Sequence, residues 1–143
     1  MSNRPVVVDA GPLVAYLNHS DAHHSRAVAR FKEVTFPLLT CEAVLTEAAF
    51  LLGPRQGHGA RVVLEYVTRG AIRPTFRLED EAVAVAELAK KCANVPMSLA
   101  DACLVRMMDT TPDALLLTTD SDFAVYRRSR GRPIPTITPA DEA

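Results

Sequence analysis

The sequence has few of the residues that hold small secreted domains together or bind zinc through thiolates. It contains no tryptophan, and its three cysteines, Cys41, Cys92 and Cys103, lie far apart and form no Cys-x-x-Cys pair. An odd number of widely spaced cysteines argues against a disulfide framework and against a thiolate zinc site. We therefore expect reduced, buried thiols.

The sequence also lacks an excess of charge and any long apolar run. Its 16 basic and 17 acidic residues give a formal net charge of −1, so bulk electrostatics do not indicate a polyanionic partner. Any nucleic-acid surface would have to be a local patch. No apolar run approaches the roughly 18 residues of a membrane span, and a strand pattern begins directly after the first residues. We expect a soluble, cytoplasmic protein that does not bind a membrane.

What the sequence does contain is an alternation of strand and helix patterns, with 48% hydrophobic residues over 143 positions. Short apolar runs predict strands at residues 5–9, 36–40, 115–118 and 134–137. Helical spacing predicts helices over about 12–17, 21–34, 41–52, 60–69, 79–91 and 98–109. This order is typical of one domain, residues 1–143, with three α/β/α layers and a mainly parallel sheet of four or five strands. Residues 139–143 are expected to be frayed.

Turn and cap residues mark the expected ends of these helices. Asp21 is predicted to cap the second helix and Thr40 the third, while Gly70 occupies the position of a C-terminal cap glycine. The three glycines between positions 53 and 59 precede no Gly-Lys-Ser/Thr, which favours a flexible connector over a phosphate-binding loop. His19, His23 and His24 are close in sequence, but they flank a polar turn, which favours solvated side chains over a metal site.

The stretch from Leu115 to Phe123 reads Leu-Leu-Leu-Thr-Thr-Asp-Ser-Asp-Phe. It predicts a strand buried on both faces that breaks into a turn carrying Asp120 and Asp122. Asp9 closes the first strand in the same way. Ligands of open α/β sheets bind beyond the carboxyl ends of the strands, so these acids are candidate ligand-binding groups. The alternative is an ordinary Asx turn with no further role.

Two more acids occur at unexpected places in predicted helices. Asp101 is spaced by one helical turn from Leu104 and Val105, and Glu47 is flanked at helical spacing by residues such as Val44 and Phe50. Both carboxylates are therefore expected on faces that the fold would bury, which costs several kcal/mol without compensation. Two alternatives are a capping box, in which Asp101 contacts the backbone of Ser98, and a simple ion pair of Glu47 with an arginine.

Together these acids indicate a metal site. The predicted fold brings Asp9 and Asp120 from strand ends and Glu47 and Asp101 from helix starts toward one edge of the sheet. Converging carboxylates repel one another unless cations lie between them. Ligation by oxygen alone favours Mg²⁺ or Mn²⁺ over zinc.

Four segments, in order along the chain, resemble the motifs of PIN domains, and more narrowly those of VapC-type toxins of bacterial toxin–antitoxin pairs. They are Val-Val-Asp-Ala-Gly-Pro-Leu-Val-Ala-Tyr-Leu around Asp9, Val-Leu-Thr-Glu-Ala-Ala around Glu47, Ser-Leu-Ala-Asp-Ala-Cys-Leu-Val around Asp101 and Leu-Thr-Thr-Asp-Ser-Asp-Phe around Asp120. Each motif alone is weak, whereas four in the right order are a strong signal.

The resemblance implies a Mg²⁺-dependent endoribonuclease that hydrolyses RNA phosphodiesters with a metal-activated water. It implies metal binding by Asp9, Glu47, Asp101 and Asp120, with Asp122 either an accessory ligand or a structural neighbour. Thr118 matches a hydroxyl position that supports the site or its water, and Phe123 matches a core aromatic. The resemblance further implies an antitoxin protein and a homodimer.

Contacts to RNA must come from local positive charge. Arg127, Arg128, Arg130 and Arg132 follow the acidic turn closely and are candidate phosphate ligands. The alternative is a solvated loop of mixed role, as many charged runs are.

Two other functions remain open from the sequence. A Mg²⁺-dependent phosphatase or phosphotransfer domain also places an aspartate at a strand end, but Asp9 is not followed by a second aspartate two residues later. A catalytically inactive PIN-like binding module would be recognised by a missing acid, and none of the four acids is missing.

Overall fold

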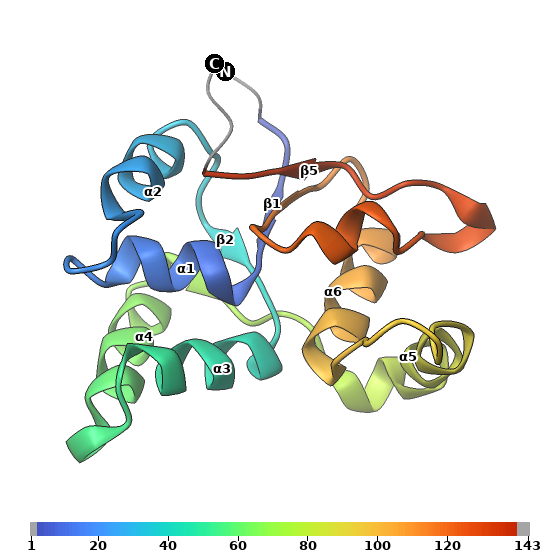
Figure 1. The fold of residues 1–143 in the computed structure, drawn as a ribbon, viewed down its shortest axis with the longest axis horizontal. Helices are drawn as coiled ribbons and strands as arrows, with labels where there is room; N and C mark the ends of the chain where they lie inside the picture. Colours follow the sequence, from blue (N-terminus) through green and yellow to red (C-terminus); the bar gives the residue numbers. More distant parts are fainter. Residues whose placement is uncertain (1–2, 140–143) are drawn as a thin grey trace.

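The computed structural model describes residues 3–139, so the fraying predicted for the tail falls, at 140–143, outside the described residues. Five strands form one parallel sheet in the order β3-β2-β1-β4-β5 (Figure 1). Their bounds are Val6–Val8 for β1, Leu38–Leu39 for β2, Ile72–Arg73 for β3, Leu115–Leu117 for β4 and Thr136–Ile137 for β5. The predicted α/β/α fold with a parallel sheet of four or five strands is confirmed.

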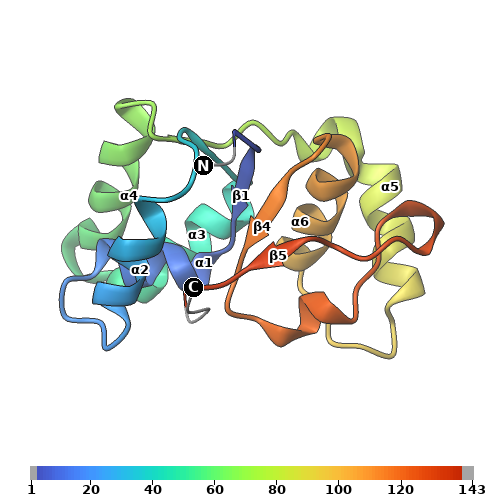
Figure 2. The same cartoon turned by 90° about the horizontal axis from the view of Figure 1, so that it is seen from above.

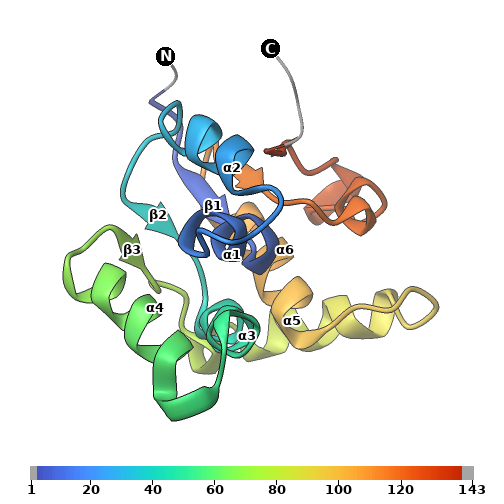
Figure 3. The ribbon, with the colours of Figure 1, turned by 60° about the vertical axis from the view of Figure 1, so that its left-hand side comes forward.

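Six α-helices connect and cover the described strands. Their bounds are Ala10–Leu17 for α1, His24–Phe31 for α2, Glu42–Leu52 for α3, His58–Thr68 for α4, Leu78–Lys91 for α5 and Leu99–Thr110 for α6. Short 3₁₀ turns lie at Arg55–Gly57 (η1), Ser121–Ala124 (η2) and Ser129–Gly131 (η3). Figure 2 shows α1 to α4 on one side of the central strands and α5 and α6 on the other, and Figure 3 shows the same layers from another direction.

The core lies around the two central strands. All three residues of β1 are buried, and the helix α6 contributes a nearly continuous buried face that includes Leu104, Val105 and Met108. A central parallel strand is covered on both faces, which explains its unbroken apolar run. The cysteines are free thiols, of which Cys41 and Cys103 are buried and Cys92 is half-buried.

Two of the predicted helix caps are wrong, and one is confirmed. Helix α2 begins at His24 with His23 as its N-cap, because the Asp21 carboxylate accepts the His23 N–H (2.8 Å) in the preceding turn. Helix α3 begins after Cys41, because the buried Thr40 hydroxyl donates to the Val8 carbonyl oxygen instead (2.9 Å). Gly70 follows α4 with φ of +79°, as a cap glycine does.

The polar turn predicted around the histidines is present between α1 and α2. The rings of His19 and His24 stack with their centroids 4.8 Å apart, and Nδ1 of His24 lies 2.9 Å from the carbonyl oxygen of Ala15. Among residues 3–139, no group of three metal-ligating side chains is assembled, here or elsewhere. No described helix has the length and apolar character to span a membrane.

The flexible connector predicted at the three glycines is wrong for Gly59. This residue lies in the first turn of α4, is buried, and donates its N–H to the Gly53 carbonyl oxygen (2.8 Å). A Cβ atom at Gly59 would fall on the backbone carbonyl of Ala49, 2.7 Å from its carbon. Helices α3 and α4 therefore approach each other closely because position 59 has no side chain.

This close approach predicts that Gly59→Ala destabilises the protein. The added methyl meets backbone of α3, which cannot rotate away, so the two helices must separate at a cost of ~1–3 kcal/mol. The midpoint of urea denaturation measures the effect. Gly57→Asn is the control, since position 57 faces open space at a positive φ that asparagine tolerates. Equal midpoints for Gly59→Ala and the wild type would contradict this account of the packing.

Candidate active site

The register of the two central strands brings the predicted acids of two loops together. Val8 of β1 lies opposite Leu117 of β4, and the Asp9 N–H donates to the Leu117 carbonyl oxygen (3.0 Å). The residues that follow, Asp9 and Thr118, therefore face each other where both strands end. In Figure 1, α1 starts from this point and runs beside α3.

The hydroxyl of Thr118 joins the two strand ends. It is buried, donates to Oδ2 of Asp9 (2.8 Å) and accepts the backbone N–H of Asp120 (3.0 Å). The other oxygen of Asp9, Oδ1, accepts the Ala10 N–H at 2.7 Å and so caps α1. The Asp9 carboxylate is thus fixed by one donor on each oxygen.

Burial and neighbouring carboxylates act together on Asp9. Burial raises the pKa of Asp9 above its ordinary value of 3.8, the hydrogen bonds from Thr118 and Ala10 lower it, and the negative charges of Asp101 and Glu47 raise it further. The net direction is upward. Asp101 of α6 and Glu47 of α3 therefore act electrostatically on Asp9, which follows β1.

Asp120 lies at the turn after β4, where the sequence left two alternatives open. Its Oδ1 accepts the Asp122 N–H (2.9 Å), so the Asx turn is present and caps η2. This turn uses one oxygen of Asp120 and is compatible with a ligand role for the other. The Asp122 side chain, half-buried, has no hydrogen bond or ion pair recorded within residues 3–139.

Asp101 also has the structural role that the sequence offered as an alternative. Ser98 and Asp101 form a capping box at the start of α6, in which the Ser98 N–H donates to Asp101 Oδ2 (3.3 Å) and the Asp101 N–H donates to Ser98 Oγ (3.0 Å). The residues one turn on are buried, so the expected apolar surroundings of Asp101 are confirmed.

Tyr126 is a site residue that the sequence reasoning missed. It is buried, and its hydroxyl lies 3.1 Å from Asp101 Oδ2 and 2.9 Å from the Pro96 carbonyl oxygen, either of which accepts its proton. Burial raises its pKa, and so do the charges of Asp101, Asp122 and Asp120. Tyr126 is therefore a neutral donor beside the acids. No motif marks it, because its contact with Asp101, 25 residues earlier, forms only in the folded chain.

The prediction that Glu47 lies on a buried apolar face of its helix is wrong. Glu47 is exposed, and its neighbours Phe50 and Leu51 are 68% and 53% exposed. Its carboxylate therefore has no burial cost to offset. Glu47 still interacts electrostatically with Asp9, so it borders the same cluster from the solvent side.

The acid cluster consists of Asp9, Glu47, Asp101, Asp120 and Asp122. None of the ion pairs found among the described residues includes a member of this cluster, so the alternative in which Glu47 pairs with an arginine is not found among them. The donor set fits a hard divalent cation in its chemistry, being all carboxylate oxygens without a cationic partner. Among residues 3–139, no three of these side chains are grouped closely enough to bind one ion together.

The predicted arginines follow the acidic turn in the chain, and three of the four are held by contacts to other residues. Arg127 Nη1 donates to the carbonyl oxygens of residues 124–126, Arg128 Nε donates to the Pro133 carbonyl oxygen (2.9 Å), and Arg132 lies 3.6 Å from Asp109. Arg130 has no interaction recorded with another described residue. The segment lines a groove of about 390 Å³ that Tyr126 and Lys91 also border.

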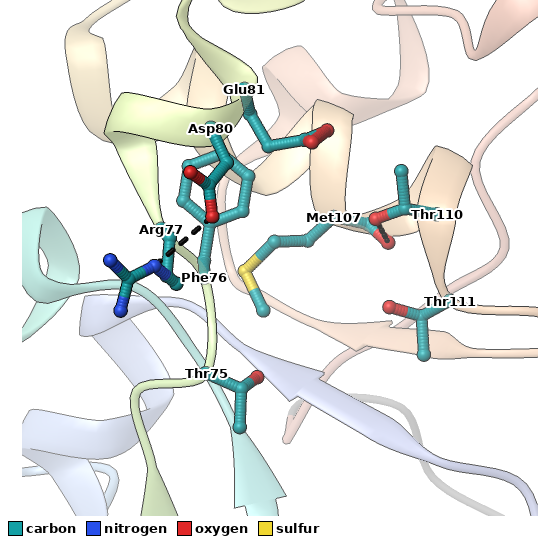
Figure 4. A pocket seen from close by; sticks show the side chains of 8 residues that line it. All are labelled: Thr75, Phe76, Arg77, Asp80, Glu81, Met107, Thr110 and Thr111. Atoms are coloured by element: carbon teal, nitrogen blue, oxygen red, sulfur yellow. Dashed lines mark hydrogen bonds and ion pairs between the residues drawn. The ribbon is translucent and has the colours of Figure 1, made fainter.

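A separate cavity of about 220 Å³ lies between the start of α5 and the end of α6 (Figure 4). In Figure 4, Nε of Arg77 donates a hydrogen bond to Oδ2 of Asp80 (3.0 Å), and Met107 lies across from Phe76. None of the predicted site residues lines this cavity. It is therefore not part of the acid cluster.

This chain is similar to known proteins both in sequence and in structure. The sequence profile described as "PIN domain" matches residues 6–129. Among solved structures, the chain is similar to the crystal structure of Mycobacterium tuberculosis VapC20, described as a sarcin-ricin loop cleaving toxin, with a TM-score of 0.68 and 22% identity over 84% of this chain and 93% of that one. A search of curated proteins finds no match. The match to the profile spans nearly the whole described fold and all members of the acid cluster, and the chain belongs to the PIN domain family.

Proposed function

We propose that this protein is a Mg²⁺- or Mn²⁺-dependent endoribonuclease, the toxin of a toxin–antitoxin pair. The observation that carries the proposal is the state of Asp9. A desolvated carboxylate lies beside two further acids, with an upward pKa shift, and no cation is recorded as its partner among residues 3–139. A divalent cation would relieve both the desolvation and the repulsion.

In this proposal Asp9, Asp101, Asp120 and Glu47 hold the cation, with Asp122 as a further candidate ligand. When bound, such a cation lowers the pKa of a water and offsets the negative charge that develops at the phosphate. Thr118 positions both Asp9 and the Asp120 turn through its hydroxyl. Tyr126 holds Asp101 in orientation by donating to Oδ2.

RNA is the proposed substrate class because of two supporting facts. The PIN family match and the likeness to a toxin that cleaves a sarcin-ricin loop favour a nuclease. The groove that presents Arg130 and Lys91 is also lined by Tyr126, whose hydroxyl contacts Asp101, and its positive charge suits phosphate contacts.

An antitoxin and a second copy of the chain are proposed as protein partners. Phe50 and Leu51 of α3 and Leu64 of α4 are all more than half exposed. Helices α3 and α4 pack against each other, so these apolar side chains lie on neighbouring elements and favour a surface that a protein covers.

The first test concerns the proposed ligands. We expect Asp9→Asn and Asp101→Asn to lower kcat/KM for RNA cleavage by more than ~100-fold, beyond the 10–100-fold typical of residues outside the ligand sphere. A Mg²⁺-dependent cleavage assay on total cellular RNA measures this, with circular dichroism to verify folding. Asp80→Asn, in the cavity of Figure 4, is the matched control. Cleavage retained by both Asn variants would contradict the assignment.

The second test concerns cation binding without any RNA. At neutral pH, Mg²⁺ at about 100 times its dissociation constant is expected to stabilise the fold by ~2.7 kcal/mol, because it binds only the folded state. Protons compete for Asp9, and since its folded-state pKa is raised above 3.8, this stabilisation disappears as the pH falls through that raised pKa.

Without the cation the sign is opposite. The raised pKa means that ionised Asp9 destabilises the folded state at higher pH, and that this penalty is relieved as the pH falls from the raised pKa toward 3.8. Thermal melts across this pH range, with and without Mg²⁺, measure both effects. A melting temperature that ignores Mg²⁺ at every pH would rule out the cation site.

The third test concerns Tyr126. Tyr126→Phe removes the donor to Asp101 but keeps the edge-to-face ring pair with Phe123, whose centroids are 5.2 Å apart. We expect Mg²⁺ affinity, measured by calorimetry, to fall about 10-fold, with a smaller change in the urea midpoint. Tyr66→Phe is the control hydroxyl deletion, since Tyr66 lies in α4. Unchanged Mg²⁺ affinity in Tyr126→Phe would show that the hydroxyl serves only the fold.

A further inference from the structure

A cavity of about 270 Å³ is formed by other residues than those of the arginine groove, and the two share no lining residue. Gly11 and Thr119 form its border with the cluster, since Gly11 is two residues after Asp9 and Thr119 lies between Thr118 and Asp120. The rest of its wall comes from α1, from the start of α2 and the turn before it, and from Pro139, two residues after β5. Figure 2 shows the end of β5 approaching α1 and α2.

The border between cavity and acids is narrow. A Cβ atom at Gly11 would lie 2.5 Å from Oγ1 of Thr119, so the first turn of α1 and the acidic turn approach closely here. The cavity holds several times the ~30 Å³ that one water occupies in the liquid. A group bound in it would therefore contact residues within two positions of Asp9 and Asp120 in the sequence.

The wall of the cavity combines an apolar part with a charged edge. Ala15 and Pro139 are buried and supply the apolar part, whereas Asp21, His23 and Arg26 gather at the entrance of α2. A nucleobase has the same division, with apolar faces and a hydrogen-bonding edge. RNA-binding proteins recognise unstacked bases by contact with their faces and hydrogen bonds to their edges.

Arg26 is available for such a contact. Its side chain is exposed, and no hydrogen bond or ion pair to another residue of the described chain is recorded for it, unlike Arg30 one turn later, whose Nε donates to the Thr138 carbonyl oxygen (3.2 Å). A guanidinium presents several donors in a planar fork, which suits the acceptors of a base edge. The Asp21 carboxylate uses Oδ1 for the His23 N–H and leaves Oδ2 as an acceptor.

We propose that this cavity binds one nucleotide of the RNA substrate, adjacent to the scissile phosphate, with Arg26 as the residue that recognises its base. The inference rests on the proposed ribonuclease function and names a base-binding subsite for it. The base lies against Ala15 and Pro139, and Arg26 donates to its edge while its phosphate points past Gly11 toward the acids. Arg26 is thereby a specificity residue and takes no part in the chemistry.

The test uses mononucleotides first, because their binding does not require cleavage. The common nucleoside 5′-monophosphates are titrated separately into the isotope-labelled full chain, and backbone amide shifts are followed by NMR. We expect shifts concentrated at Gly11, Ala15, Arg26 and Thr119, with different affinities for different bases. Arg26→Gln should weaken binding at least about tenfold, the loss expected for one charge-assisted hydrogen bond. Arg77→Gln, in the cavity of Figure 4, should not.

The second arm sequences the ends of RNA fragments released from total cellular RNA. Arg26→Gln should alter the base preference beside the cleaved bond, whereas Arg77→Gln should leave it unchanged. Absence of any cleavage by the wild type refutes the proposed function, and the titration then decides on the cavity alone. Shifts that appear at Arg130 instead of Gly11 and Thr119, equal binding by Arg26→Gln, or an unchanged base preference in an active Arg26→Gln variant would overturn the subsite.

Discussion

One buried hydroxyl, that of Thr118, determines the geometry of the acid cluster. It donates to Asp9 after β1 and accepts the N–H of Asp120 after β4, so two strand ends are joined by one side chain. The parallel register that pairs Val8 with Leu117 makes this contact possible. A shift of one residue would turn Thr118 to the other face of the sheet and separate the two acids. The site therefore depends directly on the register of the central strands.

Hydrogen bonds to the clustered acids compensate part of their negative charge. Asp9 is held by donors on both oxygens, which lower its pKa, but burial and the neighbouring acids outweigh them. Asp101 and Asp120 each direct one oxygen to a backbone N–H and keep the other. Each carboxylate thus has a capping role and keeps one oxygen for the proposed ligand role. Local hydrogen bonds anchor each acid, and the remaining repulsion is the part that a bound cation would relieve.

Much of the fold could be predicted because it depends on local patterns, such as the unbroken apolar runs of β1 and β4, and the places of Asp9 and Asp120 follow from the ends of these strands. The strand β3 was missed, since Ile72 is buried but Arg73 is exposed and two residues show no periodicity. Contacts between residues far apart in the sequence were also missed, such as the contact of the Tyr126 hydroxyl with Asp101. Glu47 was chosen with a wrong reason, because helical spacing cannot tell whether an apolar face such as that of Phe50 packs inside the same chain.

Two recesses of different chemistry are lined by residues that contact or directly neighbour the clustered acids, and in the proposed function they serve two kinds of recognition. The groove of Arg130 and Lys91 adjoins Asp101 through Tyr126, whereas the cavity of Arg26 adjoins Asp9 and Asp120 through their loop neighbours. Contacts to phosphates hold any sequence, while contacts to base edges distinguish sequences. Removal of positive charge from the groove should therefore weaken the binding of all RNA substrates alike and reduce the salt dependence of binding. Removal of the charge of Arg26 should instead change which sequences are cleaved. Affinity and selectivity would then depend on different recesses and could be changed separately.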